Sequence, residues 1–205
     1  MSTTALFIII SNTILPHLSK NLSKDLYYHC LQHTIDVEKE AVRIALNENI
    51  SNPEEFFLLK VACLYHDSGF LFTYRDHEVA GCNLAKKELP AYGLNQQQID
   101  IICGLIMATR IPQTPLTKLE QVICDADLDY LGREDFLPIS SNLFLELKAR
   151  NFISTEKEWN QIQINFFKQH SFFTATNKQL RQKKNQIIFI LLKQCYNTYS
   201  DFLFN

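Results

Sequence analysis

The sequence contains little glycine and proline, with five and six residues among 205. Because these residue types mark turns and interrupt helices, their scarcity favours a compact protein with few long loops. Long apolar runs are also missing. The longest near the start, ALFIII at residues 5–10, is too short to cross a bilayer and lacks the flanking features of a signal peptide. We therefore expect no membrane span and no signal peptide.

Charge and cysteine patterns exclude further classes of protein. The net charge is −2, so no overall field attracts the chain to nucleic acid or to an anionic membrane. The six cysteines show neither CxxC pairs nor zinc-ribbon spacing; they stand at positions 30, 63, 82, 103, 124 and 195. We interpret them as reduced, buried thiols of a cytoplasmic protein.

Signatures of three common enzyme classes are absent. The sequence has no GxxxxGKS/T phosphate loop, no GxGxxG dinucleotide loop and no GxSxG elbow. These absences disfavour a P-loop ATPase, a Rossmann dehydrogenase and a serine hydrolase.

Helical patterning dominates what the sequence does contain. Capping signals mark several helix starts: Asn52 with Pro53 and Glu55, Asn95, Thr117 with Glu120, and Thr155 with Glu158. We expect an all-α protein with helices at about 22–48, 52–69, 76–90, 96–109, 118–131, 141–152, 155–170 and 176–203. It should form a single domain over 1–205, with a core at about 22–135 and C-terminal helices at about 138–205 packed on it.

Polar side chains interrupt the apolar stripe of the first expected helix, 22–48. His33 lies in the middle of the stripe, and His29 lies one turn earlier, beside Asp36 and Glu40. Buried polar groups need partners, and a metal ion supplies them. For His33 taken alone, a core histidine bonded to a neighbouring carboxylate is the more common arrangement, and the other motifs decide between the two interpretations.

Two further clusters contain residues of the same chemical kind. His66 and Asp67 end the apolar run FFLLKVACLY; a helix C-terminus favours a histidine but disfavours an aspartate, and a cation bound by both explains the pair. On the helix at 118–131, Asp127 lies at the edge of the buried stripe, whereas Asp125 and Asp129 should face solvent as surface acids. Asp127 is therefore the third candidate ligand.

The order His33, His66–Asp67, Asp127 resembles the HD-domain superfamily of metal-dependent phosphohydrolases, over residues 22–135. The segment YHCLQHTIDV is similar to the YHNxxHxxDV signature of cyclic-nucleotide phosphodiesterases, with Cys30 in place of the asparagine. The patterns HDxGF, LIxAT and DADLxxLG of small bacterial predicted HD phosphohydrolases have counterparts here in HDSGF, LIMATR and DADLDYLG.

The resemblance implies an HD-domain helical bundle with a C-terminal helical extension, and a role for each residue. His33, His66, Asp67 and Asp127 would bind a divalent Mn, Fe, Mg or Zn ion, whose identity the sequence leaves open. Catalysis would use metal-activated water oriented by Asp67, with His29 as proton donor to the leaving oxygen. The expected substrate is a nucleotide or another small phosphoester. The alternative is a non-catalytic metal- and nucleotide-binding regulatory module.

Three residues are candidates for a second metal site or for phosphate contact. His77 matches one of two additional histidines of two-metal relatives, but no histidine stands near Ala108, where the second would fall. A structural role for His77, paired with Asp76 or Glu78, is equally open. Arg110 and Arg133 are candidate phosphate clamps, although a surface role is the more common one for arginine. The cationic run at 178–185 suggests a solvated helix face. Nucleic acid and membrane are not expected partners; a homo-oligomer is compatible with the sequence.

Overall fold

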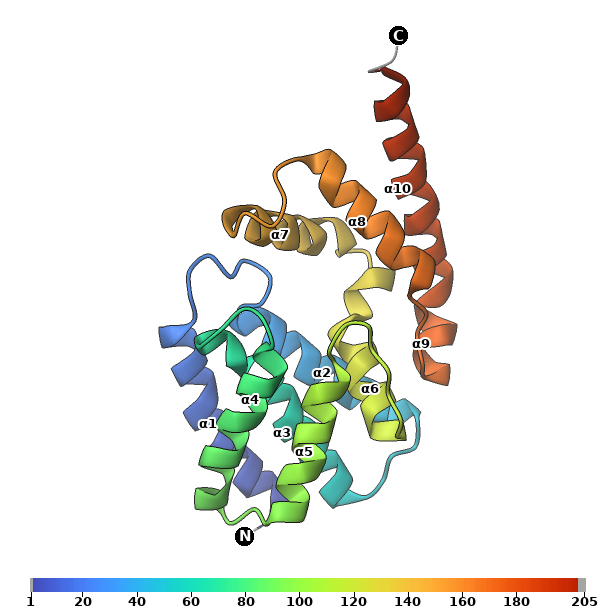
Figure 1. The fold of residues 1–205 in the computed structure, drawn as a ribbon. Coiled ribbons are helices and arrows are strands. Elements are labelled where there is room, and N and C mark those ends of the chain that lie inside the picture. Colours follow the sequence, from blue (N-terminus) through green and yellow to red (C-terminus); the bar gives the residue numbers. More distant parts are fainter. Residues whose placement is uncertain (1, 203–205) are drawn as a thin grey trace.

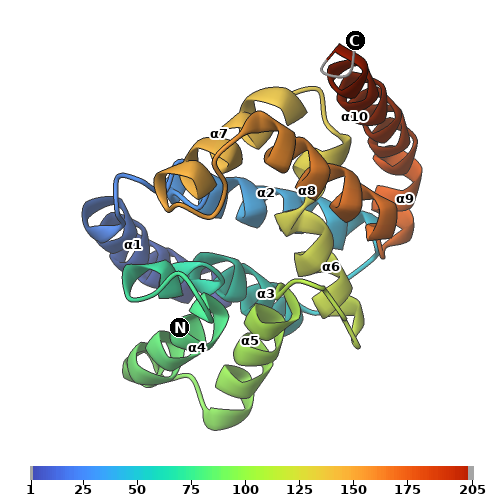
Figure 2. The same ribbon diagram turned by 45° about the horizontal axis from the view of Figure 1, so that its top comes forward.

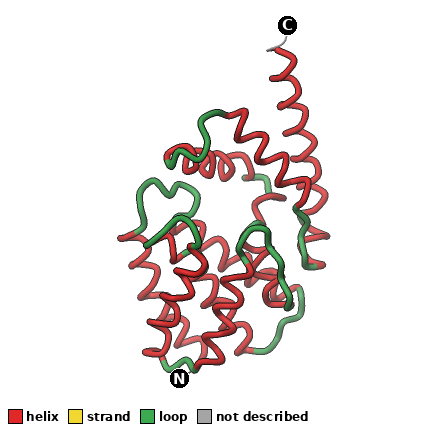
Figure 3. The backbone as a smooth tube through the Cα atoms, in the orientation of Figure 1, coloured by secondary structure: helices red, strands yellow, loops and turns green. Residues whose placement is uncertain are grey.

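The structure is a computed structural model that describes the backbone of residues 2–202 and the side chains of residues 2–194. It confirms the expected all-α class, and the described residues contain no strand (Figure 3). The α-helices are α1 (Thr3–Asn21), α2 (Leu31–Asn47), α3 (Pro53–Tyr65), α4 (His77–Glu88), α5 (Gln96–Ala108), α6 (Lys118–Asp127), α7 (Phe136–Ala149), α8 (Glu156–Gln169), α9 (Ala175–Leu180) and α10 (Gln182–Phe202). Short 3-10 helices follow three of them: η1 (Ser68–Leu71), η2 (Leu89–Tyr92) and η3 (Asp129–Gly132).

The helices form two regions, which Figures 1 and 2 show from two sides. Helices α1 to α6 form a bundle, and α7, α8 and α10 lie across one end of it. Helix α3 is the centre of the bundle, because its apolar residues from Phe57 to Tyr65 are all buried. A second, smaller apolar cluster joins η3 to the C-terminal helices and includes Leu131, Phe136 and Phe167. The site lies where the two regions meet, as the next section shows.

Helix α2 begins later than expected, and helix α1 was not expected at all. Residues 22–30 are irregular rather than helical, so His29 precedes α2 and is not part of it. The backbone N–H groups of Tyr28 and His29 donate to the Glu146 carboxylate, which removes them from any helical hydrogen-bond ladder. Helix α1 buries Ile10, Ile14 and Leu18 at intervals of four, a stripe typical of an amphipathic helix.

Other helix starts follow the capping signals closely. The capping boxes of Thr117 with Glu120 and of Thr155 with Glu158 are both formed, and Asn95 caps α5. Asn52 begins α3 by accepting from the Glu54 N–H, so the expected pairing with Glu55 is wrong. Other boundaries differ: α3 ends at residue 65, α6 ends at residue 127, α7 begins at 136, and the helix expected at 176–203 is divided into α9 and α10.

The prediction that Asp125 and Asp129 face solvent is wrong. Both residues are buried: Asp125 is 1% exposed and Asp129 is 0% exposed. The segment around α9 covers this side of α6, and Asp125 accepts hydrogen bonds from the Thr174 hydroxyl at 2.6 Å and from the N–H groups of Phe173 and Thr174 at 2.8 and 2.9 Å. The periodicity of a single helix cannot show that a segment about 50 residues later packs against its polar face.

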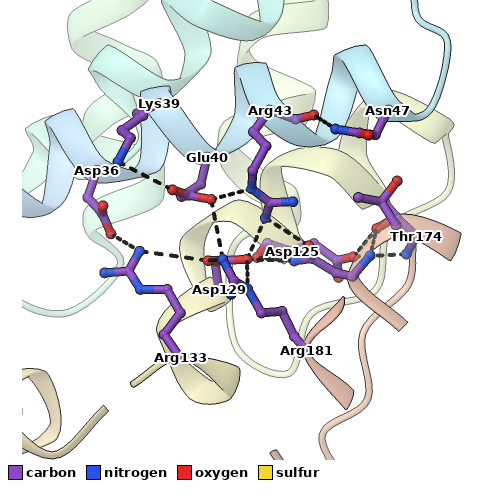
Figure 4. A network of polar contacts seen from close by, with 12 residues as sticks. Asp36, Lys39, Glu40, Arg43, Asn47, Asp125, Asp129, Arg133, Thr174 and Arg181 are labelled. Atoms are coloured by element: carbon purple, nitrogen blue, oxygen red, sulfur yellow. Dashed lines mark hydrogen bonds and ion pairs between the residues drawn. The ribbon is translucent and has the colours of Figure 1, made fainter. Parts of the chain in front are cut away.

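Asp129 is held in a charged network that connects three parts of the chain (Figure 4). Its carboxylate contacts Arg43 of α2 at 2.7 Å, Arg181 between α9 and α10 at 2.9 Å, and the Asn177 amide at 3.0 Å. Arg181 belongs to the cationic run 178–185, which was expected to form a solvated helix face. Its guanidinium instead takes part in this internal ion-pair network. Since Asp125 and Asp129 flank residue 127, these contacts immobilise the chain on both sides of Asp127.

Two simpler expectations can also be compared with the structure. The described cysteines are free thiols, and Cys63, Cys82, Cys103 and Cys124 are buried. The side chain of Cys195 lies outside the described residues. Within the described part of the chain, no helix has the length and apolar character needed to cross a bilayer.

Candidate metal site and adjoining cavity

Three helices bring four of the predicted ligands together. His33 comes from α2, His66 and Asp67 follow α3, and Asp127 is the last residue of α6. The His33 Nε2 atom lies 3.1 Å from Asp127 Oδ1 and 3.4 Å from His66 Nε2. His66 Nε2 lies 3.7 Å from the same Asp127 oxygen, so one atom from each of these residues faces a common point. This convergence is the arrangement expected of a metal-binding cluster.

The tautomer of His66 is determined by its backbone contact. Its Nδ1 atom lies 2.8 Å from the Cys63 carbonyl oxygen, which can only accept, so Nδ1 carries a proton. In the neutral imidazole, Nε2 then offers its lone pair to the cluster. Hydrogen bonds of this type orient metal-ligating histidines in proteins.

Asp67 contributes an oxygen that lacks a hydrogen-bond partner. Its Oδ2 atom is fully buried and unpartnered, although His66 Nε2 is 3.2 Å away and His33 Nε2 is 3.5 Å away. Buried carboxylate oxygens are normally satisfied, so an unpartnered one among imidazoles fits a cation-binding position. The donor set of two imidazoles and two carboxylates fits a divalent transition metal.

The electrostatics of the cluster fit the same interpretation. Burial alone would lower the pKa of His66, but the charge of Asp67 outweighs it and raises that pKa to about 9. Burial alone would raise the pKa of Asp67, but the charge of His66 holds it well below its usual range. The two opposite shifts show that the imidazole and the carboxylate stabilise each other's charged forms. A divalent cation at this place would interact favourably with the same ionised carboxylate.

His29 stands beside the cluster and is held by a residue that the sequence analysis missed. Its Nδ1 atom lies 2.5 Å from Oε1 of Glu146 on α7, whose side chain is fully buried. The same carboxylate accepts the Tyr74 hydroxyl at 2.9 Å and the backbone N–H groups of Tyr28 and His29 at 2.9 and 3.0 Å. Burial would raise the pKa of Glu146, but the hydrogen bond from His29 lowers it, so the carboxylate is ionised.

The consequence for His29 is a defined orientation. A carboxylate on Nδ1 keeps the proton there and leaves Nε2 as the ring atom available to a ligand. The only signal for Glu146 in the sequence is an acid in the otherwise apolar segment LFLEL at residues 143–147, 117 residues from its partner. That separation conceals the pair from motif reasoning.

His77 also reaches the cluster. Its Nε2 atom lies 3.4 Å from Asp67 Oδ1 and 3.6 Å from Glu78 Oε1, and its ring stacks on Phe70 at 3.9 Å. Gly69 makes this approach possible, because a Cβ atom there would stand 1.8 Å from the His77 carbonyl oxygen. The glycine of HDSGF is thus required for α4 to approach Asp67.

Arg110 and Arg133 both stand near the site, and both are already engaged in ion pairs. Arg110 contacts Asp76, and its Nε atom lies 3.5 Å from Glu78. Arg133 contacts Asp36 and Asp135, each at 2.7 Å. Both guanidinium groups are therefore partly neutralised by carboxylates, and only their remaining N–H groups are available to a phosphate.

A cavity of about 410 Å³ adjoins the cluster. Its polar end is lined by His29, Asp67, His77, Glu78 and Asp127, and the rest is lined mainly by apolar side chains of η3, α7 and α8. A volume of this size accommodates a small organic ligand. The imidazole of His29 and the ligand cluster therefore face the same space.

Comparison with known proteins agrees with this geometry. The profile of the HD domain family matches residues 30–129, a range that contains all four cluster residues. The fold is similar to the crystal structure of a predicted HD superfamily hydrolase from an uncultured Thermotogales bacterium, with a TM-score of 0.57, 21% identity and coverage of 93% of this chain and 91% of that chain. A search of curated proteins found no match. Glu146 lies outside the matched range, and His29 lies one residue before it.

Proposed function

Since residues 30–129 of this chain match the profile of the HD domain family, we propose that the protein is a metal-dependent phosphohydrolase that acts on a small phosphoester. One observation carries the proposal. The unpartnered Oδ2 atom of Asp67, together with His33, His66 and Asp127, adjoins a cavity that the Glu146-bound His29 also lines. Phosphoester hydrolysis needs an activated water molecule and a proton donor for the leaving oxygen, and a metal cluster beside an oriented imidazole can supply both.

A divalent cation held by His33, His66, Asp67 and Asp127 would activate a water molecule and neutralise charge on the phosphoryl oxygens. Water attacks phosphorus, and the bond from phosphorus to the leaving oxygen breaks. His29 donates the proton that the leaving oxygen needs, from Nε2. Glu146 holds the ring in place through its contact with Nδ1. The nucleotide class suggested by the sequence resemblance, the identity of the metal and the assignment of Asp67 as a water-orienting residue remain predictions.

The rival proposal is a regulatory module that binds metal and nucleotide without catalysis. A metal used only for structure needs its ligands but not a second imidazole oriented by a buried carboxylate. The pair of His29 and Glu146, with Nδ1 and Oε1 2.5 Å apart, therefore favours the enzyme.

Metal analysis combined with phosphoester hydrolysis tests the proposal. Wild type, Asp127→Asn and the surface control Asp100→Asn would be purified, supplied with Mn²⁺, and compared for bound metal, thermal unfolding and hydrolysis of 4-nitrophenyl phosphate and bis(4-nitrophenyl) phosphate. We expect wild type and Asp100→Asn to bind metal and hydrolyse at least one ester. Asp127→Asn should remain folded and lose metal and activity together. A metal-loaded wild type that hydrolyses neither these esters nor a panel of nucleotides would support the regulatory module instead.

A further inference from the structure

The cavity beside the metal cluster has a chemical character that narrows the class of substrate. We infer that it receives the part of the substrate beyond the phosphate, and that this part is an uncharged, apolar body rather than a nucleoside polyphosphate. The inference rests on the proposed function for the position of the phosphate. The shape and lining of the cavity are independent of that function.

The wall of the cavity away from the cluster is apolar and largely aromatic. Leu131 of η3, Phe136 and Leu147 of α7, and Trp159 and Phe166 of α8 all line it. Walls of this kind favour an apolar ligand, because its surface is transferred out of water on binding. Aromatic side chains also stack against planar rings.

Apart from the two histidines, the ionisable residues that line the cavity are acidic or tyrosines. Asp67, Glu78 and Asp127 line the polar end with His29 and His77, and no lysine or arginine of the described chain contributes to the lining. The nearest arginines are paired with carboxylates, as described above. A bound divalent cation can balance a single phosphate, whereas a di- or triphosphate would bring one or two more negative charges into a cavity whose lining has no lysine or arginine. Such a ligand is therefore disfavoured.

Polar groups in the wall are already occupied. The Thr109 hydroxyl donates to the Ile106 carbonyl at 2.8 Å, and the Tyr74 hydroxyl donates to Glu146 at 2.9 Å. The buried Gln163 amide accepts from Ser140 at 2.7 Å. A ribose or base placed here would lose its hydrogen bonds to water and find few replacements, which costs free energy. An alkyl or aryl group loses none.

A series of phosphonates tests the inference without relying on turnover. Methyl-, propyl- and hexylphosphonate and ADP would be titrated into the full chain supplied with Mn²⁺, by calorimetry and by emission from Trp159, the only tryptophan of the sequence. Burial of each methylene should lower Kd about fourfold, so hexylphosphonate, with five more methylenes, should bind about 10³-fold more tightly than methylphosphonate. ADP should bind no more tightly than methylphosphonate. Equal Kd values along the alkyl series, or tighter binding of ADP than of hexylphosphonate, would overturn the inference.

Matched variants locate the binding in this cavity. Ile162 lines the cavity and is 44% exposed, while Ile190 of α10 is 53% exposed and is not part of the lining. Ile162→Asn and Leu147→Asn should weaken hexylphosphonate more than methylphosphonate, by about three- to tenfold, and Ile190→Asn should change neither Kd. Equal effects of Ile162→Asn and Ile190→Asn would place the alkyl chain elsewhere and refute the inference.

The two proposals fail in different ways. Chain-length-dependent binding with no hydrolysis of hexyl, phenyl or nucleoside phosphates would refute the phosphohydrolase and retain the apolar cavity as a ligand site. Hydrolysis of ATP or ADP with a higher kcat/KM than hexyl phosphate would retain the phosphohydrolase and refute the apolar substrate.

Discussion

The α1–α6 bundle and the C-terminal segment from α7 onward contribute different kinds of residue to the same site. The bundle supplies the metal cluster, with every donor at or near a helix end. The C-terminal segment supplies no cluster residue, but it supplies Glu146, most of the apolar cavity wall and the contacts that immobilise Asp125 and Asp129. The candidate metal cluster thus lies within the family profile, whereas Glu146, which contacts His29, and most of the apolar cavity wall lie outside it.

We expect the largest effect from removal of the His29 imidazole, which lies beside the metal cluster and is bonded to Glu146 of the C-terminal segment. His29→Ala should retain metal and fold, and kcat on alkyl phosphates should fall by about 10²–10⁴-fold, because the leaving oxygen then departs without a positioned acid. The loss should be smaller on 4-nitrophenyl phosphate, whose leaving group needs no proton. Steady-state kinetics on both esters, with metal content measured in parallel, provide the check; an equal loss on the two esters would contradict the acid role.

Replacement of the carboxylate partner tests the C-terminal contribution by itself. Glu146→Gln should lower kcat by about 10–100-fold, less than removal of His29, and should leave metal content unchanged. The loss should be larger on alkyl phosphates than on 4-nitrophenyl phosphate, because the acid role of His29 depends on the ring orientation that Glu146 fixes. A variant with reduced stability and equal losses on the two esters would show that Glu146 acts only in folding.

A glycine substitution tests the close approach of α4 to the segment after α3 within the bundle. Gly69→Ala should destabilise the protein by about 1–3 kcal/mol and displace His77, because the added Cβ meets the His77 carbonyl oxygen. Gly104→Ala is the matched control: its Cβ would meet only Glu120 at 3.7 Å, so helix propensity should make it neutral or stabilising by up to about 1 kcal/mol. Urea unfolding of both variants measures the difference, and equal stabilities would contradict the close approach.

The smallest expected effect concerns acid stability of the C-terminal segment. Burial lowers the pKa of His170 to about 4 from its ordinary value of 6.5. The unfolded chain therefore binds a proton below about pH 6.5 that the folded chain does not, and stability falls as pH drops from about 6.5 toward 4. The loss attributable to this group should be about 1–2 kcal/mol between pH 7 and pH 5. His170→Leu should flatten that part of the profile in urea titrations; an unchanged slope would show that His170 is not responsible.

The elements that were predictable from the sequence are those set by neighbouring residues. Capping boxes such as Thr117 with Glu120 determine a helix start within four positions, and the prediction is confirmed. The grouping of His33 with His66 and Asp127 followed from a family resemblance, and the structure brings them within 4.8 Å of one another.

What was not predictable depends on contacts between distant residues. The irregular segment before α2 exists because Glu146, more than a hundred positions later, binds its N–H groups. Asp125 is buried because Thr174 covers it. Neither contact leaves a periodic or local trace in the sequence, so each required the folded chain.

The distance along the chain between His29 and Glu146 has a consequence for synthesis. A ribosome releases the metal cluster well before it releases α7, and residues 173–181 emerge later still. On the proposed function, the nascent bundle can acquire its metal while His29 still lacks its carboxylate and the cavity has no walls. Hydrolytic competence would therefore arise late, at the docking of the last third of the chain, and a protein cut short before residue 146 would remain a metal-binding bundle with an unoriented acid.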